Sequence, residues 1–357
     1  MTRCIRLAKN GVGYVSPNPL VGCVILKNGR IIGEGYHQKF GDAHAEVNAI
    51  RSAADDVAGS DLYVNLEPCS MFGKTPPCVD LIIEKRIARV HIAMLDPNPL
   101  VNGNGVRKLR DAGIEVEVGI QTEAARELNE VFIKFITTRM PFVVMKVAQS
   151  LDGKIALSNG ASKYITSAES LKRVHEMRAQ YDSVLVGAGT VAADDPRLTV
   201  RYSEGRSPVR ILIDGNLSTS PDAHVFADRN AIVFFSRRIE KNKTVLGRLK
   251  KIQSKGVRTV GMSASKVNRT SLESILKRIG EMSIASVLVE GGTSVFSQFI
   301  KRGLVDKFHV FVAPKIIGEG KSMADEFALR SLDRALTLRL IELTRLGPDI
   351  MLTGYPD

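Results

Sequence analysis

The stretch that decides the fold of the first part of the chain is His44-Ala45-Glu46, which is followed by the pairs Pro68-Cys69 and Pro77-Cys78. One imidazole and two thiolates supply three ligands of a tetrahedral zinc ion, and catalytic zinc sites leave the fourth position open to water. We therefore predict that His44, Cys69 and Cys78 bind Zn²⁺. Glu46 is the candidate for proton transfer beside the metal.

Taken singly, each of these residues has a simpler interpretation. A lone histidine can lie in the core or on the surface, and a cysteine is often a small buried apolar side chain. The combination of His-x-Glu with two Pro-Cys pairs favours the metal site. Cys78 follows a proline at the start of a predicted helix, so we also expect the helix dipole to lower the pKa of its thiol. Cys4 and Cys23 are expected to be structural.

The sequence around the pattern predicts an α/β domain. Asn28-Gly29 between two apolar runs is typical of a β-hairpin. The apolar spacing beyond it predicts helices and strands in alternation. Helices are expected over residues 43–54, 79–85, 105–112 and 122–137, and strands over 61–66, 87–94 and 114–118. Such alternation indicates a sheet covered by helices.

The periodicity breaks at Thr137-Thr138-Arg139-Met140-Pro141, and an apolar strand follows. At 357 residues the chain exceeds the size at which single cores stop growing. We place a domain boundary here, giving domains 1–140 and 141–357. The second part is also predicted to be α/β, with strands over 142–147, 183–186, 209–213, 231–235, 286–289 and 307–312 and helices over 167–179, 271–282 and 294–301.

Charge is unevenly distributed between these parts. Residues 1–140 contain 17 Lys and Arg against 16 Asp and Glu, whereas residues 141–357 contain 33 against 22, so nearly all of the net +12 lies beyond residue 140. A basic region attracts polyanionic ligands such as phosphorylated metabolites, dinucleotides or nucleic acid. A solvated basic surface is an equally good explanation.

Composition indicates a folded protein of a reducing compartment. Charges interrupt the first ten residues, which excludes a signal peptide there, and the sequence contains no apolar run long enough for a membrane span. Four irregularly spaced cysteines do not indicate a disulfide framework. We expect a cytoplasmic protein.

His-x-Glu followed by Pro-Cys pairs is typical of zinc-dependent deaminases, although their usual spacing between the cysteines is shorter. Over nearly its whole length the chain resembles the bifunctional deaminase/reductase family of riboflavin biosynthesis. The first domain carries this resemblance in Ser16-Pro-Asn-Pro-Leu-Val-Gly-Cys-Val24, Gly33-Glu-Gly-Tyr-His37, Leu66-Glu-Pro-Cys-Ser70, Gly73-Lys-Thr-Pro-Pro-Cys78 and Asp96-Pro-Asn-Pro99. The second carries it in Lys146, Ser150-Leu-Asp-Gly-Lys154, Ile165-Thr-Ser167, Asp194-Asp-Pro196, Leu198-Thr199, Glu290-Gly-Gly292 and Ala313-Pro-Lys315.

The resemblance implies a cytidine-deaminase-like three-layer domain, followed by a dihydrofolate-reductase-like α/β domain that uses NADPH. The first would remove ammonia from a diaminopyrimidinone ribosylamine 5′-phosphate, and the second would reduce the ribosyl group to a ribityl chain. It also implies that Asn18 contacts the substrate. We expect a homo-oligomer acting on this small phosphorylated pyrimidine, without nucleic-acid or membrane partners.

For the reductase, the resemblance implies two sets of contacts. The cofactor set is Ala148, Tyr164, Thr190, Asp194, Gly291 and Gly292, and the substrate set is Ser162, Arg178, Leu198, Arg201 and Glu290. Backbone amides of the glycine turns could bind phosphate at helix N-termini, and the two arginines could hold a substrate phosphate. The proton donor stays open among Glu290, Asp194 and Lys154. Where this chain has Met71 and Tyr164, many relatives have His and Trp. These differences bear on substrate affinity and on stacking of the nucleotide, and not on the reaction class.

Two other functions are consistent with parts of the pattern. The substrate could be a base in tRNA or DNA, with the basic C-terminal region as a clamp. That region, however, contains no Trp and no aromatic residues interleaved with its basic ones. Alternatively, zinc could be purely structural, but an open fourth position beside Glu46 argues against this.

Overall fold

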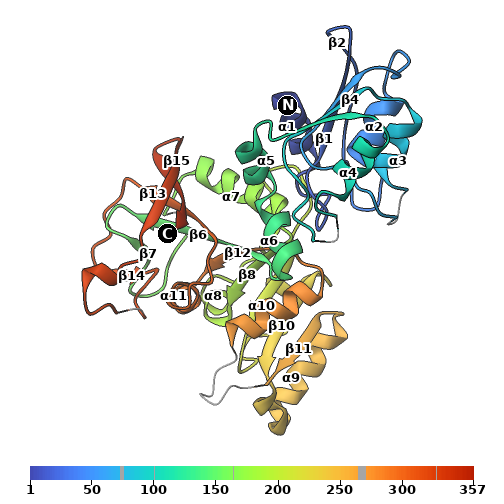
Figure 1. Cartoon of the computed structure of the whole chain (residues 1–357). Helices are drawn as coiled ribbons and strands as arrows, with labels where there is room; N and C mark the ends of the chain where they lie inside the picture. The colour runs from blue at the N-terminus through green and yellow to red at the C-terminus, as the bar shows by residue number, and fades with distance from the viewer. Residues whose placement is uncertain (73–75, 100, 164, 264–270, 327) are drawn as a thin grey trace. The chain divides into compact units, whose positions relative to one another are not determined.

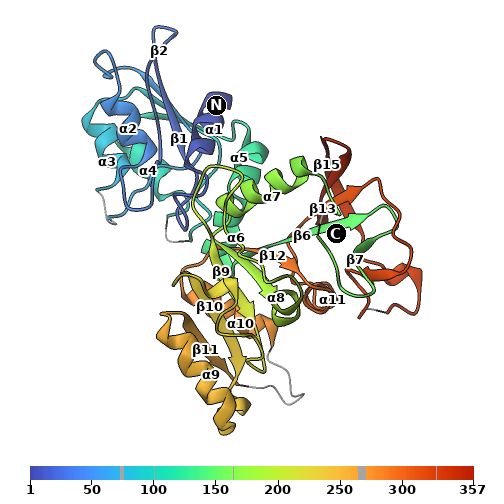
Figure 2. The same cartoon turned by 180° about the vertical axis from the view of Figure 1, so that it is seen from behind.

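The computed structural model describes residues 1–72, 76–99, 101–163, 165–263, 271–326 and 328–357. The chain divides into two compact units, Met1–Met140 and Pro141–Asp357 (Figure 1). Each unit contains a β-sheet and helices of its own, as both views show (Figure 2).

The first unit is built on a five-stranded sheet in the order β2-β1-β3-β4-β5. The strands are β1 (Gly22–Lys27), β2 (Arg30–Tyr36), β3 (Asp61–Val64), β4 (Arg89–Ile92) and β5 (Glu115–Val118). The predicted hairpin is confirmed, because β1 and β2 pair in an antiparallel manner with Lys27 opposite Arg30. Asn28 and Gly29 both have positive φ, as two-residue hairpin turns require.

Helices cover both faces of this sheet. They are α1 (Thr2–Ala8), α2 (Ala45–Arg51), α3 (Cys78–Glu84), α4 (Asn104–Asp111), α5 (Thr122–Leu128) and α6 (Glu130–Thr138), with a short 3₁₀ helix η1 (Lys9–Gly11). Glycines let two helices contact opposite faces. An added Cβ at Gly22 would lie 2.1 Å from Cys4 O on α1, and one at Gly35 would lie 2.4 Å from Ala49 N on α2. The result is the expected three-layer arrangement.

One prediction in this unit is wrong. The single helix expected over residues 122–137 is two helices that meet at Asn129. Asn129 is buried, its side-chain oxygen accepts from Leu20 N, and its amide donates to Leu20 O. This tertiary hydrogen bonding to the segment before β1 explains a break that helical periodicity does not reveal.

The second unit contains a nine-stranded sheet in the order β11-β10-β9-β8-β12-β6-β13-β16-β15. Its strands are β6 (Phe142–Ser150), β8 (Ser183–Gly187), β9 (Val209–Ile213), β10 (Ala231–Ser236), β11 (Arg258–Met262), β12 (Ser286–Gly291), β13 (Lys307–Ala313), β15 (Leu338–Leu346) and β16 (Asp349–Pro356). A separate pair joins β7 (Lys154–Leu157) to β14 (Gly320–Ser322). The strands from β11 to β13 are parallel, and β16 and β15 close the sheet in an antiparallel manner.

The helices of this unit are α7 (Ala168–Gln180), α8 (Ala188–Asp194), α9 (Lys243–Ser254), α10 (Leu272–Glu281) and α11 (Thr293–Lys301), with 3₁₀ helices η2 (His224–Phe226), η3 (Arg237–Lys241) and η4 (Leu332–Arg334). All the predicted strands are present. The parallel pairing of β8 with β12 brings the carboxyl ends of both strands to one edge, where α8 and α11 begin. The two glycine turns, Gly187-Ala-Gly-Thr190 and Gly291-Gly-Thr293, therefore lie next to each other.

Elements missing from the prediction are mostly short or polar, such as β7, β14 and α9. The long β15–β16 hairpin was also missed. β15 has strand alternation but lies at a sheet edge, where exposed charged side chains weaken the apolar signal. Among the described residues, no helix is both long and apolar enough to cross a lipid bilayer.

Candidate functional site

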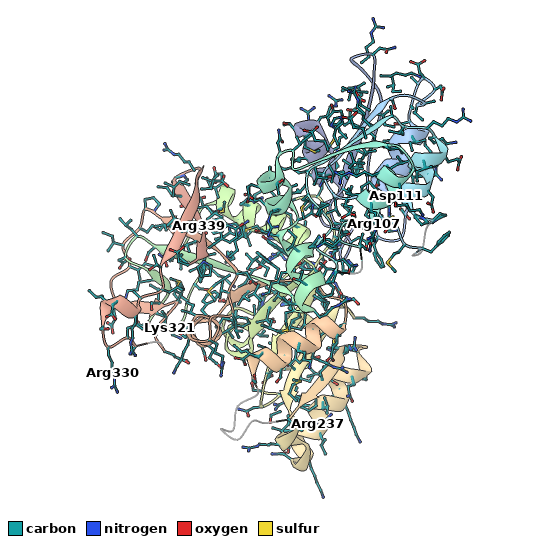
Figure 3. All side chains as sticks on the ribbon, viewed as in Figure 1. Arg107, Asp111, Arg237, Lys321, Arg330 and Arg339 are labelled. Atoms are coloured by element: carbon teal, nitrogen blue, oxygen red, sulfur yellow. The ribbon has the colours of Figure 1, made fainter. Side chains whose placement is uncertain are left out.

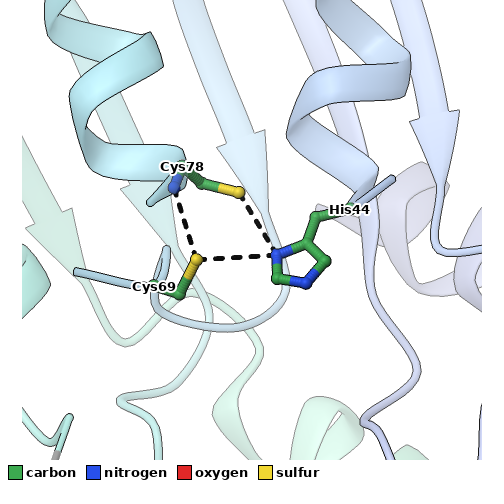
Figure 4. Close-up of side chains that lie close together, drawn as sticks. All are labelled: His44, Cys69 and Cys78. Atoms are coloured by element: carbon green, nitrogen blue, oxygen red, sulfur yellow. Dashed lines mark hydrogen bonds between the residues drawn. The ribbon is translucent and has the colours of Figure 1, made fainter. Parts of the chain in front are cut away.

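The three predicted metal ligands converge in the first unit. His44 is the N-cap of α2, Cys69 lies in the loop after β3, and Cys78 is the first residue of α3. His44 Nδ1 lies 3.5 Å from Cys69 Sγ and 3.3 Å from Cys78 Sγ (Figure 4). Neighbouring loops and helix starts therefore bring together residues up to 34 positions apart.

These distances fit a shared metal ion. Zinc binds imidazole nitrogen at about 2.0 Å and thiolate sulfur at about 2.3 Å, so tetrahedral geometry places these two atoms roughly 3.6 Å apart. The observed separations from Nδ1 are close to this value. All three donor atoms lie within 4.8 Å of one another. The donor set is that of a zinc site with one open position.

The electrostatics of the cluster favour a bound cation, but the thiol whose pKa is lowered is Cys69 and not Cys78. The Cys78 N–H at the start of α3 points to Cys69 Sγ at 3.3 Å. Hydrogen bonds from the Cys78 side chain and from His44 lower the pKa of Cys69 to about 4. The prediction that the helix start lowers the pKa of the Cys78 thiol is wrong, because the hydrogen bond to Cys69 and burial raise that pKa.

Glu46 lies in the first turn of α2 and is 97% buried beside this cluster. Burial, followed by the negative charge of Cys69, raises the pKa of Glu46 to about 7. Its carboxylate also accepts a hydrogen bond from Cys78. His44 has extended backbone geometry rather than helical geometry, which allows side chains two residues apart to reach one centre.

Asn18 reaches the same centre through His37. Asn18 Nδ2 lies 3.1 Å from His37 Nε2, and His37 Nδ1 lies 3.1 Å from Ala43 O. The His37 ring packs edge-on against the ring of His44, with centroids 5.5 Å apart. In the sequence, only the family string Gly33-Glu-Gly-Tyr-His37 pointed to His37, because an isolated histidine has no ligand spacing that would mark it as part of a site.

The second unit has a buried ionic site at the carboxyl end of β12. Arg178 donates from Nε and Nη2 to the two Glu290 oxygens at 2.6 and 2.8 Å. Lys146 Nζ, on β6, lies 3.9 Å from Glu290. Burial raises the pKa of Glu290, but the charge and hydrogen bonds of Arg178, helped by Lys146, outweigh it and hold the pKa at about 2. Lys146 was not among the predicted site residues.

A second layer of contacts holds the segment that follows Leu198. Arg178 Nη1 donates to Thr199 O at 3.3 Å, and Arg201 N donates to His175 Nδ1 at 2.9 Å. The two side chains in these contacts, those of Arg178 and His175, both belong to α7. Leu198 is buried with a positive φ, whereas the guanidinium of Arg201 is on the exposed side of this segment. The fold thus places Arg201 beside the ionic site.

The predicted cofactor contacts form a neighbouring group. A Cβ at Gly292 would lie 3.0 Å from Thr190 Oγ1, and Gly291 has a φ of +136° that favours glycine. Ser162 Oγ, from the predicted substrate set, donates to both oxygens of Asp194 at 3.1 and 3.0 Å. Ala148 lies on the same face of β6 as Lys146, because strand side chains alternate. Tyr164 lies outside the described residues.

The excess positive charge is distributed over several elements of the second unit. Figure 3 labels four of its exposed basic residues: Arg237 on η3, Lys321 on β14, Arg339 on β15 and Arg330 in the segment before η4. The labelled residues thus come from four different segments of the unit.

Comparison with protein families assigns both units. Residues 1–94 match the cytidine and deoxycytidylate deaminase zinc-binding region, and residues 141–352 match the RibD C-terminal domain. The first match contains all of the metal-binding cluster. The second contains the ionic site and the paired glycine turns.

Full-length relatives share both regions. The riboflavin biosynthesis protein RibD of Aquifex aeolicus is 44% identical over 353 residues, covering 99% of this chain and 96% of the relative. The Escherichia coli protein of the same name is 37% identical, covering 99% and 97%.

Solved structures agree with these relatives. Acinetobacter baumannii RibD has a TM-score of 0.90 at 35% identity, covering 100% of this chain and 97% of that one. A Thermotoga maritima structure described as a diaminohydroxyphosphoribosylaminopyrimidine deaminase/5-amino-6-(5-phosphoribosylamino)uracil reductase has a TM-score of 0.87 at 42% identity, with the same coverage.

These matches confirm a cytidine-deaminase-like domain with a zinc site and a reductase domain of a family that uses NADPH. With relatives well above 30% identity along its whole length, the chain belongs to the RibD family of bifunctional deaminase/reductases of riboflavin biosynthesis.

Proposed function

We propose that residues 1–140 hydrolytically deaminate 2,5-diamino-6-ribosylamino-4(3H)-pyrimidinone 5′-phosphate, and that residues 141–357 then reduce its ribosyl group to a ribityl chain with NADPH. The observation that carries the first reaction is the convergence of His44 Nδ1 and the two thiols beside the buried Glu46. The names of the relatives suggest the substrate.

In the deaminase, we assign His44, Cys69 and Cys78 as zinc ligands. When bound, zinc supplies Lewis-acid activation of water for attack on the ring carbon. Glu46 takes the proton from the attacking water and returns it to the departing ammonia, since its carboxylate is buried at the cluster and accepts a hydrogen bond from Cys78. Asn18, oriented by His37, contacts the pyrimidine.

In the reductase, we assign substrate contacts to Ser162, Arg178, Leu198, Arg201 and Glu290. Arg178 is buried and donates to Glu290 and Thr199 O. Arg201 is exposed and, among the described residues, makes one side-chain hydrogen bond, to Thr199 Oγ1, so it is the better ligand for the 5′-phosphate. Ala148, Tyr164, Thr190, Asp194 and the Gly291-Gly292 turn contact NADPH. The cofactor supplies the hydride, and the protein orients it.

The structure adds Lys146 to the proton-donor candidates Glu290, Asp194 and Lys154, because Lys146 Nζ lies 3.9 Å from Glu290 in the buried ionic site. A pKa of about 2 keeps Glu290 ionised at neutral pH, which makes it a poor acid. Burial lowers the pKa of the adjacent Lys146, more than Glu290 raises it. We therefore propose Lys146 as the donor and Glu290 as the group that holds it in place.

The decisive experiment is to incubate zinc-loaded protein with the diaminopyrimidinone substrate, first without NADPH and then with it. Ammonia release in the first stage and NADPH oxidation in the second support both assignments. Ammonia without NADPH oxidation would leave only the deaminase. No ammonia from wild-type protein would refute the substrate assignment, and RNA and DNA bases would then be tested.

We also propose that the chain is a cytoplasmic homo-oligomer. The four cysteines are all free, which fits a reducing compartment. The proposal of an oligomer is based on the resemblance to the family. Light scattering of the purified protein tests it, and a monomer at micromolar concentration would refute it.

A further inference from the structure

Glu67, the residue two positions before the ligand Cys69, is one of the most constrained acidic groups in the first unit. It is 97% buried and follows β3 in the loop that carries the ligand. Its backbone N–H donates to Met94 O at 3.0 Å, which ties this loop to the end of β4. Nothing in the proposed chemistry of the metal centre uses its carboxylate.

The Glu67 carboxylate accepts four backbone hydrogen bonds. Oε1 accepts from Gly105 N at 2.9 Å and Val106 N at 3.3 Å, both in the first turn of α4. Oε2 accepts from Gly103 N and Asp96 N, each at 3.0 Å. The carboxylate thus satisfies amides at the start of α4, where negative charge is also favoured by the helix dipole.

The junction is tightly packed as well as hydrogen-bonded. An added Cβ at Gly105 would lie 2.3 Å from Pro68 O, so the first turn of α4 lies directly against the backbone between Glu67 and Cys69. On its other side, Cys69 contacts α3, because Val79 N donates to Cys69 O at 3.2 Å and Cys78 N donates to the sulfur. The position of Cys69 is therefore set by α3 on one side and by Glu67 on the other.

We propose that Glu67 is a positioning residue of the metal centre: it holds Cys69 Sγ at the distance from His44 and Cys78 that a metal ion requires. This proposal rests on the zinc site of the proposed deaminase. All four partners of Glu67 are donors, so only a carboxylate satisfies them. A glutamine of the same shape would direct its NH₂ group at two N–H groups in either orientation.

The test compares Glu67→Gln with Ser60→Ala in the full chain. Ser60 is equally buried, donates to Val57 O at 2.6 Å, and lies at the opposite end of β3, away from the ligands. Zinc affinity is measured by competition with a chelator, and ligand geometry by the absorption spectrum of the cobalt(II)-substituted protein. Thermal unfolding reports general destabilisation in both variants.

Loss of a residue that orients a metal ligand typically weakens metal binding by about 10- to 100-fold. We expect this weakening in Glu67→Gln, together with an altered cobalt spectrum, and an affinity within about twofold of wild type in Ser60→Ala. Glu67→Asp, which retains the charge, should recover part of the affinity. It also decides the question if Glu67→Gln does not fold.

Unchanged zinc affinity and cobalt spectrum in Glu67→Gln would overturn the proposal, as would equal losses in Ser60→Ala. If only Glu67→Asp folds, wild-type affinity and spectrum in that variant would overturn it. A wild-type protein that binds no zinc would instead refute the proposed deaminase, so the two failures are distinguishable.

Discussion

The two units hold their buried polar groups in opposite ways. In the first, the donor atoms of His44, Cys69 and Cys78 face one another, and a bound cation would balance the negative charge of the thiolates. In the second, Glu290 is already neutralised by Arg178 and Lys146. The first cluster is therefore suited to binding a metal ion, whereas the second is a buried ionic cluster whose charges are already paired within the protein. The expected effects of mutation differ accordingly.

The largest effect should come from Glu46→Gln, which keeps the shape of the side chain but removes its ability to shuttle a proton. We expect ammonia release to fall by roughly 10³-fold, since proton transfer by a positioned side chain contributes about 10²- to 10⁴-fold. NADPH oxidation with the deaminated substrate should be unchanged, which serves as the control. A loss in both assays would contradict the separation of the two activities.

Next is Arg178→Leu, which leaves Glu290 buried with only Lys146 nearby. Removing one partner of a buried ion pair typically costs about 3–5 kcal/mol, and Lys146 should keep the loss near the lower end of this range. Denaturant titration measures this loss of unfolding free energy, and hydrogen exchange shows whether α7 and β12 lose protection. Unchanged protection of both elements would show that the pair contributes little to the unit.

The matched control for that variant is Arg89→Leu. Arg89 also donates from Nε and Nη2 to a carboxylate, that of Asp61, at 2.6 and 2.9 Å, but its side chain is 52% exposed. Solvent screens such pairs, so we expect a much smaller loss of stability than in Arg178→Leu. If the two arginine variants lose equal stability, burial is not what distinguishes the ion pairs.

A smaller effect is expected from acid. Burial lowers the pKa of His309 to about 3, so the folded state keeps it neutral while the unfolded state protonates it below about pH 6.5. Because the unfolded state binds more protons, stability falls as the pH decreases from 6.5 towards 3, by about 2 kcal/mol at pH 5.

The variant His309→Gln tests this dependence. Its loss of stability between pH 7 and pH 5 should be about 2 kcal/mol smaller than that of the wild type, as measured by urea unfolding at the two pH values. An identical pH dependence in both proteins would show that His309 does not titrate on unfolding.

Many predictions from sequence concern groups whose chemistry is local. The hairpin at Asn28-Gly29 was predictable because its turn geometry depends on the two residues that form it. The metal ligands were predictable because one histidine and two cysteines at helix starts and in a loop form a pattern that is typical of a metal site. In the second unit, the buried strands were visible as short apolar runs rich in valine.

The tertiary structure decided everything that depends on which distant groups meet. Asn129 divides a helix because its side chain binds the backbone of Leu20. The pKa of Cys69 rather than that of Cys78 is lowered because the side chains of Cys78 and His44, and then the Cys78 amide, donate hydrogen bonds to Cys69. His37, Lys146 and Glu67 acquire their places only through contacts across the fold. Periodicity and motif spacing record how a residue relates to its neighbours in sequence. The partner of a buried polar group is instead set by the packing of helices and strands, because burial makes an unsatisfied group costly wherever its partner lies in the chain.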